Sequence, residues 1–448
     1  MSSKTKTTAS KEEATPALVP KRRFPEFRDG PSWTGKPMGE AYCFKSNNSL
    51  SRDQLNYEHG SVKNIHYGDI HTKFSTLFDI TKERVPFINS SESLDGFRPE
   101  NDCVEGDMIF ADASEDLADI GKSIEIVCLN GERVVSGQHT ILARPNGDSL
   151  IVGFGAYLFK SRHVRTQIQK ESQGSKVLGI SATRLTKIKL PLPTQPAEQQ
   201  KIAECLSSVD ELIAAQARKL AALKTHKKGL MQQLFPREGE TQPRLRFPEF
   251  QNAGEWEEDK LIDIATFRRG SFPQPYGLPE WYDEVGGMPF VQVFDVGDNF
   301  RLKDKTKSKI SKLGAEKSVF IPRGTLIVTL QGSIGRVAIT HYDAYIDRTL
   351  LIFETFRKPI EKVFFARLIQ NLFDIEKEIA PGGIIKTITK EALSDFKVKL
   401  PKITEQQRIA DCLTSLDDLI AAQTQKLDTI KTHKKGLMQQ LFPSPESC

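Results

Sequence analysis

The sequence predicts a duplicated protein in which two dissimilar regions of short strands are each followed by a long, nearly identical helix. Three observations predict it: an internal repeat, a heptad pattern within the repeated segments, and short apolar runs introduced by glycine turns between them. The 448 residues allow about three domains at ~150 residues each. Hydrophobic residues make up 38% and charged residues 27%, which excludes disorder over most of the chain.

Composition excludes little else. The net charge of +5 permits a polyanionic partner but does not demand one. Residues 1–22 are polar and lack the apolar centre of a secretion signal, so we expect a mobile tail on a cytoplasmic protein. The longest apolar run, residues 150–159, is too short for a membrane span, which needs ~20 residues. The cysteines show no Cys-x-x-Cys pair and are expected to be reduced thiols.

Two pairs of segments define the repeat. Residues 23–27 (RFPEF) recur at 246–250, and residues 198–236 recur at 405–443 with 29 of 39 positions identical. Within the second pair, KTHKKGLMQQLFP is unchanged between the two copies. Chance does not produce such identity, so the chain is a duplicated unit.

Between the repeated segments only faint echoes remain. Gly106 and Gly324 each introduce a short apolar run that is typical of a strand, and Gly121 has its echo in Gly335. The dipeptide His139-Thr140 stands beside Arg348-Thr349. Lys176 followed by Ser181 stands beside Lys386 followed by Thr389. The two variable regions are therefore expected to be diverged versions of one domain.

The repeated segments predict two coiled-coil helices. Alternating steps of four and three residues give a mostly aliphatic seam in each copy. The seam positions are Ile202, Leu206, Val209, Ile213, Gln216, Leu220, Leu223, Lys227, Leu230 and Leu234, and then Ile409, Leu413, Leu416, Ile420, Gln423, Leu427, Ile430, Lys434, Leu437 and Leu441. An unbroken helix of this length would be roughly 58 Å long.

The ends of these helices carry weaker signals. Pro196 suits a first helical turn, and Thr404 stands at capping-box spacing before Gln407. Gly229 and Gly436 could bend or end the helices.

The charges of the two helices predict how they pair. Acids gather in the first half of each helix and bases in the second, so an antiparallel pair sets opposite charges side by side. The alternative is that each helix only complements its own macrodipole. We expect the antiparallel pair.

These features together divide the chain. The predicted organisation is a tail at 1–22, a first variable domain at 23–190, a helix at 191–236, a linker at 237–250, a second variable domain at 251–398, and a helix with a C-terminal tail at 399–448.

The duplicated plan resembles the specificity subunits of Type I restriction-modification systems. The residues that carry the resemblance are the two RFPEF segments and the helix starts at 198–206 and 405–413, each of which follows a Leu-Pro step. The resemblance implies two target-recognition domains of mixed α/β fold in a pseudo-two-fold arrangement, separated by two long antiparallel helices. It also implies that each domain recognises one half of a split, asymmetric DNA sequence, and that the helices set the gap and bind two methyltransferase subunits. Restriction and translocase subunits would complete the complex.

Base recognition requires polar side chains that reach groove edges, and phosphate binding requires cations. On this basis, the predicted DNA-binding residues are Lys122, Gln138, His139, Lys160, Arg162, Arg165 and Lys176 in the first domain, and Arg268, Arg269, Gln331, Ser333, Arg336, Arg348 and Lys386 in the second. The unchanged run predicts two equivalent partner-binding sites, at Leu230, Gln232, Gln233 and Phe235 and at Leu437, Gln439, Gln440 and Phe442.

Catalytic signatures are missing from the sequence. It contains no Asn/Asp-Pro-Pro-aromatic motif of an adenine methyltransferase, and Gly153-Phe154-Gly155 is too short for a cofactor loop. The segment Glu257-Glu258-Asp259-Lys260 has a nuclease-like order but is interpreted as a charged face. The chain is therefore predicted not to be an enzyme by itself. The resemblance places S-adenosylmethionine, ATP and Mg²⁺ on partner subunits.

Two alternatives stay open. A stand-alone DNA nuclease would show metal-dependent cleavage by the purified chain. A coiled-coil scaffold would bind protein partners with no preference among DNA sequences.

Overall fold

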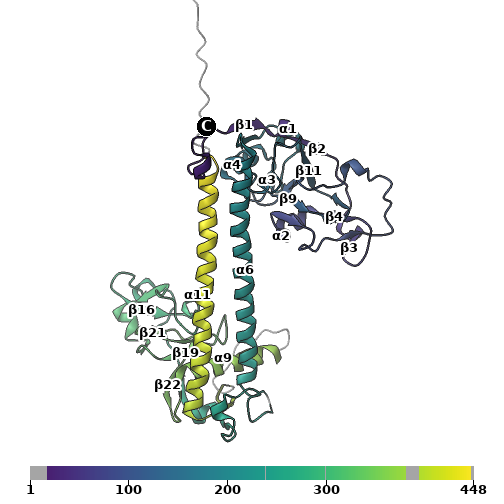
Figure 1. Cartoon of the computed structure of the whole chain (residues 1–448). Coiled ribbons are helices and arrows are strands. Elements are labelled where there is room, and N and C mark those ends of the chain that lie inside the picture. The colour runs from purple at the N-terminus through teal and green to yellow at the C-terminus, as the bar shows by residue number, and fades with distance from the viewer. Residues whose placement is uncertain (1–17, 238, 298, 380–392, 445–448) are drawn as a thin grey trace, which may run out of the picture. The chain divides into compact units, whose positions relative to one another are not determined.

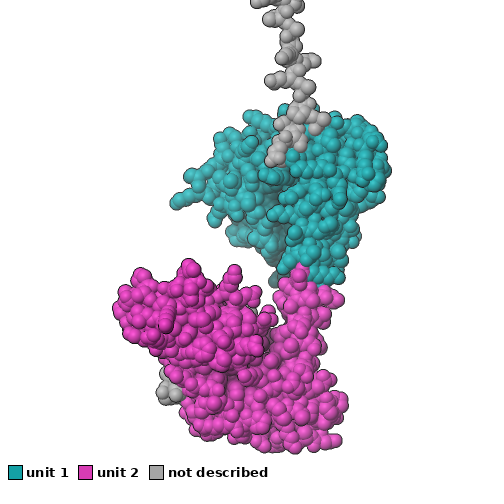
Figure 2. All heavy atoms as spheres, turned by 90° about the vertical axis from the view of Figure 1, so that its left-hand side faces the viewer, with its two compact units in different colours: residues 1–216, 426–448 teal, residues 217–425 magenta. Residues whose placement is uncertain are grey.

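The computed structural model describes residues 18–237, 239–297, 299–379 and 393–444 and divides the chain into two compact units. Unit 1 comprises residues 1–216 and 426–448, and unit 2 comprises residues 217–425 (Figure 2). Two helices, α6 (Pro196–Leu234) and α11 (Ile403–Leu441), each contribute to both units. Within the described residues, no helix is long and apolar enough to cross a membrane.

Within each unit, a segment of α6 lies beside a segment of α11 and runs in the opposite direction (Figure 1). In unit 1 the Lys434 ammonium donates to both carboxylate oxygens of Asp210, at 2.5 and 2.7 Å. In unit 2 Lys227 forms the matching ion pair with Asp417. Every predicted seam position is buried or half-buried. The antiparallel pairing predicted from charge is confirmed in both units.

The helix ends correct two details of the prediction. Helix α6 begins at Pro196, as expected, but α11 begins at Ile403. The predicted capping role of Thr404 is therefore wrong, because this residue already lies inside the helix. Gly229 and Gly436 do not end the helices, because α6 continues to Leu234 and α11 continues to Leu441.

Unit 1 contains a five-stranded sheet of order β2-β11-β7-β9-β5 and a four-stranded sheet of order β10-β4-β6-β3. Two ribbons, β1-β13 and β12-β8, complete it. Its strands are β1 (Thr34–Pro37), β2 (Tyr42–Lys45), β3 (Leu55–Asn56), β4 (Lys63–Ile65), β5 (Leu77–Asp79), β6 (Phe87–Ile88), β7 (Met108–Ala111), β8 (Ala113–Ser114), β9 (Ser123–Cys128), β10 (Val134–Ser136), β11 (Thr140–Pro145), β12 (Leu178–Gly179) and β13 (Lys189–Leu192). Its short helices are α1 (Met38–Ala41), α2 (Tyr67–Thr72), α3 (Phe154–Leu158), α4 (Arg162–Glu171) and α5 (Ala182–Leu185).

Unit 2 contains two four-stranded sheets, of order β15-β22-β19-β20 and β17-β16-β21-β18, and the ribbon β14-β23. Its strands are β14 (Glu257–Lys260), β15 (Ala265–Arg269), β16 (Met288–Val291), β17 (Ser308–Ile310), β18 (Val319–Ile321), β19 (Leu326–Thr329), β20 (Val337–Ile339), β21 (Ala344–Ile346), β22 (Leu350–Phe356) and β23 (Lys397–Leu400). Its other helices are α7 (Leu261–Ile264), α8 (Lys312–Ala315) and α9 (Lys362–Ile379). Both units thus mix helices and strands, as predicted.

The two units share one plan, in which β2, β11, β7 and β9 correspond to β15, β22, β19 and β20. The glycine echoes mark this correspondence. Gly106 and Gly324 both have positive φ just before β7 and β19. A Cβ on Gly121 would lie 2.7 Å from Ile168 of α4, and one on Gly335 would lie 2.5 Å from Phe373 of α9. Both positions combine positive φ with a helix packed against them, which favours glycine.

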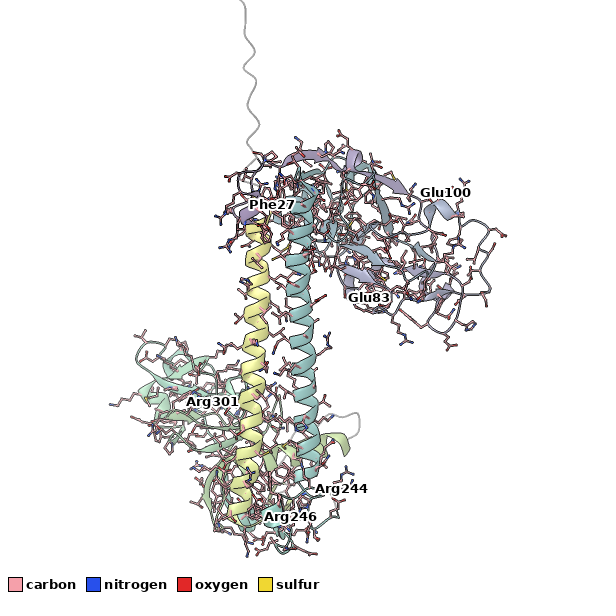
Figure 3. The ribbon with its side chains drawn as sticks, in the orientation of Figure 1. Phe27, Glu83, Glu100, Arg244, Arg246 and Arg301 are labelled. Carbon is pink, nitrogen blue, oxygen red and sulfur yellow. The ribbon has the colours of Figure 1, made fainter. Side chains whose placement is uncertain are left out.

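A buried ion pair joins the start of each long helix to an RFPEF segment. In unit 1 the Arg23 guanidinium donates to both oxygens of Glu198, at 2.8 and 2.5 Å. In unit 2 Arg246, labelled in Figure 3, donates to Glu405 at 2.8 and 2.7 Å. Each arginine also donates to two carbonyls of its own loop. The repeated sequences are thus two halves of one structural contact.

An aromatic cluster buries the end of each long helix. Phe442 follows α11 and packs on Trp33 and Phe154 of unit 1, with ring centroids 6.0 and 5.8 Å apart. Phe235 follows α6 and packs in the same way on Trp256 and Phe364 of unit 2. Both phenylalanines are only 2% exposed. Each unit therefore contains the start of one long helix and the end of the other.

Removing the guanidinium of Arg23 should destabilise unit 1. Arg23→Met leaves the Glu198 carboxylate buried with only the Trp33 indole as a side-chain partner, so we expect a loss of about 3–5 kcal/mol. The exposed pair Lys201–Glu26 provides the control, and Lys201→Met should cost at most ~1 kcal/mol. Urea unfolding followed by tryptophan fluorescence measures both. Equal midpoints for the two variants would contradict the role given to the buried pair.

Truncation of Phe442 should also destabilise unit 1. Phe442→Ala removes a fully packed ring and should cost about 3–5 kcal/mol. Gln440→Ala, at an exposed position two residues earlier, should stay within ~0.5 kcal/mol of the wild type. Thermal unfolding by calorimetry distinguishes them. An unfolding temperature of Phe442→Ala equal to that of the wild type would show that the ring is not needed for stability.

Candidate nucleic-acid interface

The ends of three strands bring most predicted DNA-binding residues of unit 2 to one edge of its sheet. Arg269 pairs with Leu351 and Thr329 pairs with Leu350, so β15 and β19 end where β22 begins. The Leu330 amide donates to the Thr349 carbonyl at 2.8 Å, which holds the next loop at the same place. The exposed side chains at this edge are Arg268, Arg269, Gln331, Ser333 and Arg348. We call this set the unit 2 edge.

The glycine-flanked loop of the unit 2 edge is tightly built. The amides of Gly335 and Arg336 donate to the carbonyl and hydroxyl of Thr329, both at 2.9 Å, and the same hydroxyl donates to the Ser333 carbonyl. The Arg336 side chain is half-buried and donates to the Val296 carbonyl at 3.4 Å. The loop therefore presents Gln331 and Ser333 outward, whereas the Arg336 guanidinium turns toward the protein.

Two residues that the sequence analysis missed adjoin this edge. The Tyr276 hydroxyl donates to Asp347 at 3.1 Å and accepts from the Gln292 side chain. The Arg348 guanidinium lies over the Tyr276 ring, 5.6 Å from its centroid. Burial and the Asp347 charge raise the pKa of Tyr276, so it remains a neutral hydrogen-bonding group. No periodic signal marks Tyr276 or Gln292, because both lie outside the strand pattern that the sequence shows.

The corresponding strand ends in unit 1 gather Lys122, Gln138 and His139. Ala111 pairs with Thr140 and Phe110 with Ser123, so β7 ends where β9 and β11 begin. His139 has positive φ and its Nδ1 lies 3.2 Å from the Asp112 carboxylate. With Asp112, these side chains form the unit 1 edge. The echo between His139-Thr140 and Arg348-Thr349 is wrong by one residue. The Asp112 amide donates to the His139 carbonyl as the Leu330 amide donates to the Thr349 carbonyl, and Thr140 and Leu350 are the first paired residues of β11 and β22, so His139 corresponds to Thr349.

A cleft of about 560 Å³ opens at the unit 1 edge. Three residues of the edge, Asp112, Gln138 and His139, line it, and Asn47, Asn48 and Arg98 are among its other lining residues. The Asn47 amide donates to the Thr140 carbonyl at 2.7 Å, and the Asn48 amide donates to the Ser136 carbonyl at 2.9 Å. These asparagines were not predicted, because Ser- and Asn-rich segments are typical of any loop.

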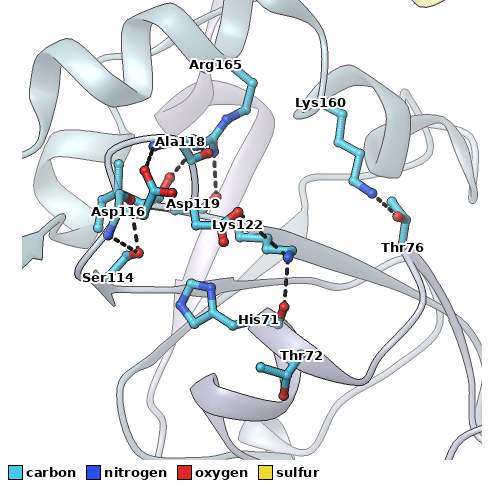
Figure 4. A network of polar contacts seen from close by, with 12 residues as sticks. His71, Thr72, Thr76, Ser114, Asp116, Ala118, Asp119, Lys122, Lys160 and Arg165 are labelled. Carbon is cyan, nitrogen blue, oxygen red and sulfur yellow. Dashed lines mark hydrogen bonds and ion pairs between the residues drawn. The ribbon is translucent and has the colours of Figure 1, made fainter. Parts of the chain in front are cut away.

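The remaining predicted residues of unit 1 have different surroundings (Figure 4). The Arg165 guanidinium donates to the carbonyls of Ala118, Ile120 and Gly121 at 2.6–3.1 Å. Loop carbonyls thus accept three of its five N–H donors, and the predicted contact of Arg165 with phosphate stays a prediction. Arg162 and Lys176 are exposed, on α4 and on the loop before β12. Lys386 lies outside the described residues.

The predicted partner-binding residues divide into two groups. Gln232, Gln233, Gln439 and Gln440 are exposed. Leu230 and Leu437 are half-buried against the cores of units 2 and 1. Phe235 and Phe442 are buried in those cores, so the prediction that they contact a partner is wrong. The sequence could not distinguish an aromatic side chain that docks a partner from one that ends a helix in its own core.

The acidic segment that could have suggested a nuclease is strand β14. Lys358 forms ion pairs with Glu257 and Asp259, and Lys397 pairs with Glu258 at 3.0 Å. These carboxylates are neutralised on a strand rather than gathered for a metal. In the part of the chain that the structure describes, no three His, Cys, Asp or Glu side chains are grouped so that they could hold a metal ion.

Comparisons with known proteins agree with the duplicated plan. The family described as the Type I restriction modification DNA specificity domain matches residues 58–225 and 253–432. A putative type I restriction enzyme specificity subunit, MjaX of Methanocaldococcus jannaschii, is 26% identical over 382 residues, covering 83% of this chain and 85% of that protein. The EcoR124I/EcoR124II specificity subunit of Escherichia coli is 25% identical over 54% of this chain and 58% of its own length.

Solved structures show the same fold. The S subunit of a Type-I restriction-modification system from M. genitalium aligns with a TM-score of 0.56 at 15% identity, covering 95% of this chain and all of that one. A chain from a type I R-M system structure that addresses complex assembly and conformational transition aligns with a TM-score of 0.56 at 18% identity, covering 92% of this chain and 98% of that one.

Proposed function

Because this chain belongs to the Type I restriction-modification DNA specificity family, as the match over both of its halves shows, we propose that each strand-end edge recognises one half of a split DNA sequence. One observation carries the proposal. Equivalent strand ends in the two units present different polar side chains, with Lys122, Gln138 and His139 in unit 1 and arginines with Gln331 in unit 2. Two recognition edges with different chemistry require two different half-sites, so the whole target is asymmetric.

The side chains at both edges suit recognition of base edges. Arginine can donate two hydrogen bonds to guanine, and glutamine or asparagine can pair with adenine in the major groove. Arg268 and Gln331 are exposed at the unit 2 edge, while the asparagine-lined cleft adjoins the unit 1 edge. Neighbouring lysines and arginines would neutralise phosphates.

Within this proposal the chain supplies recognition rather than chemistry. Methylation and cleavage would belong to partner subunits, which would bind S-adenosylmethionine, ATP and Mg²⁺. The four exposed glutamines lie on the unchanged run at the end of each long helix. In the same run Phe235 and Phe442 are buried in the cores of the two units. Identity at exposed positions is not required for packing and supports two equivalent docking sites for methyltransferase subunits. A restriction subunit would join the same complex.

Changing the unit 2 edge should relax one half-site only. Replacing Arg268, Gln331 and Ser333 with alanine removes three of the five exposed polar side chains at this edge, and each good bidentate hydrogen-bonded pair with a base is worth about 1–3 kcal/mol of discrimination. Mapping of methylated adenines in a host that carries the chain and its methyltransferase reads the result. Lys402→Ala, at an exposed position outside the edge, is the control. Unaltered recognition of both half-sites by the triple variant would contradict the role of this edge.

Changing the exposed glutamines should weaken partner assembly without unfolding the chain. The double variant Gln232→Ala with Gln233→Ala should lose one methyltransferase subunit from the complex. The double variant Gln439→Ala with Gln440→Ala should lose the other subunit, because each pair of glutamines lies on its own copy of the run. Light scattering coupled to size exclusion measures the stoichiometry. Thermal unfolding of each variant alone serves as the control, and an intact two-subunit complex in both variants would overturn the proposed docking sites.

A further inference from the structure

The unit 1 edge extends across its sheet to the long helices. Strand β5 lies parallel to β9, with Leu77 paired to Glu125, so Thr76 lies at the same edge as Lys122. Lys160 lies just after α3, and its ammonium donates to the Thr76 hydroxyl (Figure 4). Lys122 donates to the His71 carbonyl at 2.8 Å. Lys122 and Lys160 therefore form a row of cations that leads from the unit 1 edge toward Lys434 of α11.

Lys160 is the cation of this row without an acidic partner. It faces Lys434 and Asp210 from the helix pair, Lys122 from the strand edge and Arg165 from α4. Asp210 is already bonded by Lys434 and by the Tyr157 hydroxyl, which donates to it at 2.9 Å. Asp119 lies 3.7 Å from Lys122. Among the residues that the structure describes, no carboxylate comes within the 4.0 Å ion-pair distance of the Lys160 ammonium.

This crowding acts on the protonation of Lys160. The surrounding protein partly desolvates its ammonium and Lys434 repels it, which lowers the pKa of Lys160 to about 8. The Lys160 side chain is itself exposed, so an incoming anion can reach it. An anion placed against a cation in such surroundings is attracted and restores the charged form.

We propose that Lys160 binds a phosphodiester of duplex DNA that lies along the unit 1 edge, and that this contact takes up a proton. The proposal rests on the proposed DNA-reading function and adds a residue that holds the backbone and a pH dependence of binding. Duplex DNA is the fitting anion, because the row that contains Lys160 is continuous with the edge that would face bases. Phosphate contacts of this kind fix register without reading sequence.

The direction of the pH dependence follows from linkage. Phosphate raises the pKa of Lys160 in the complex above its value of about 8 in the free chain. Well below pH 8 the lysine is already charged and binding needs no proton. As the pH rises through 8, binding must protonate the amine, so affinity falls, by up to about tenfold between pH 7 and pH 9.

A mixed-sequence 40-base-pair duplex tests the contact without knowledge of the target. The full-length chain is titrated with this duplex at 50–200 mM salt and between pH 6.5 and 9. Lys160→Met should reduce the slope of log affinity against log salt at pH 7 by about 0.9 and remove the tenfold fall. Lys160→Arg should keep the slope and abolish the fall, because arginine stays charged. Lys170→Met, an exposed lysine at the far end of α4, is the matched control and should behave as wild type.

Calorimetry provides an independent readout. Titrations at pH 8 in buffers of different ionisation enthalpy should show uptake of about 0.4–0.5 proton by the wild type and none by Lys160→Arg. A salt slope for Lys160→Met equal to that of Lys170→Met, or equal proton uptake in wild type and Lys160→Arg, would overturn this inference while leaving DNA recognition intact. A chain that shows no salt-dependent DNA binding would overturn the proposed function as well.

Discussion

The structure depends on where the two long helices end. Each ends in a Leu-Phe-Pro segment whose phenylalanine is buried against a tryptophan and a second phenylalanine of the other copy's variable domain. A domain of this fold therefore does not complete its core with its own helix. It needs the helix that follows the other domain, which requires the two helices to run in opposite directions. Burial of one aromatic ring per unit thus fixes the antiparallel arrangement, and the lysine–aspartate pairs between the helices add register to it.

The repeated sequence segments can be understood from this constraint. RFPEF and the helix-start Glu-Gln-Gln are distant in sequence, yet Arg23 meets Glu198 and Arg246 meets Glu405 in buried pairs. The following glutamine is also buried in each copy. Gln199 bonds the backbone of Ile151 and Ser149, and Gln406 bonds the backbone of Glu361 and Pro359. These residues tie each variable domain to its helix. Their identity between the copies is therefore a requirement of packing, whereas identity at exposed glutamines is not.

Much of the fold could be predicted because it follows from periodicity and charge. The heptad seam predicted the helices, and the separation of acids from bases predicted their direction. Glycines at positive φ marked the equivalent strands, so Gly121 and Gly335 located the edges where Lys122 and Gln331 lie. Side-chain roles were harder to predict. The sequence marks Arg165 only as a cation that could bind phosphate, whereas in the structure three of its five N–H donors hold loop carbonyls. Only the folded loop shows that Arg165 also has this structural role.

The residues that were missed belong to loops whose position depends on tertiary contacts. Tyr276 and Gln292 are joined through one hydroxyl, and Asn47 and Asn48 are held by carbonyls beside the unit 1 edge. No local sequence pattern predicts such contacts, because the two partners of each contact are far apart in the sequence.

The position of the buried contacts at the helix ends explains how the two domains can differ in chemistry while sharing one fold. The buried arginine–glutamate pairs and aromatic clusters lie at the helix ends and involve no residue of either edge. Substitutions at the edges leave these contacts unchanged, because the strand pairing beneath them depends on the backbone. The unit 1 edge has thus acquired a histidine and an asparagine-lined cleft, and the unit 2 edge arginines beside a tyrosine, on the same order of strands. Separation of the packing contacts from the exposed strand ends is what allows one duplicated scaffold to carry two different recognition surfaces.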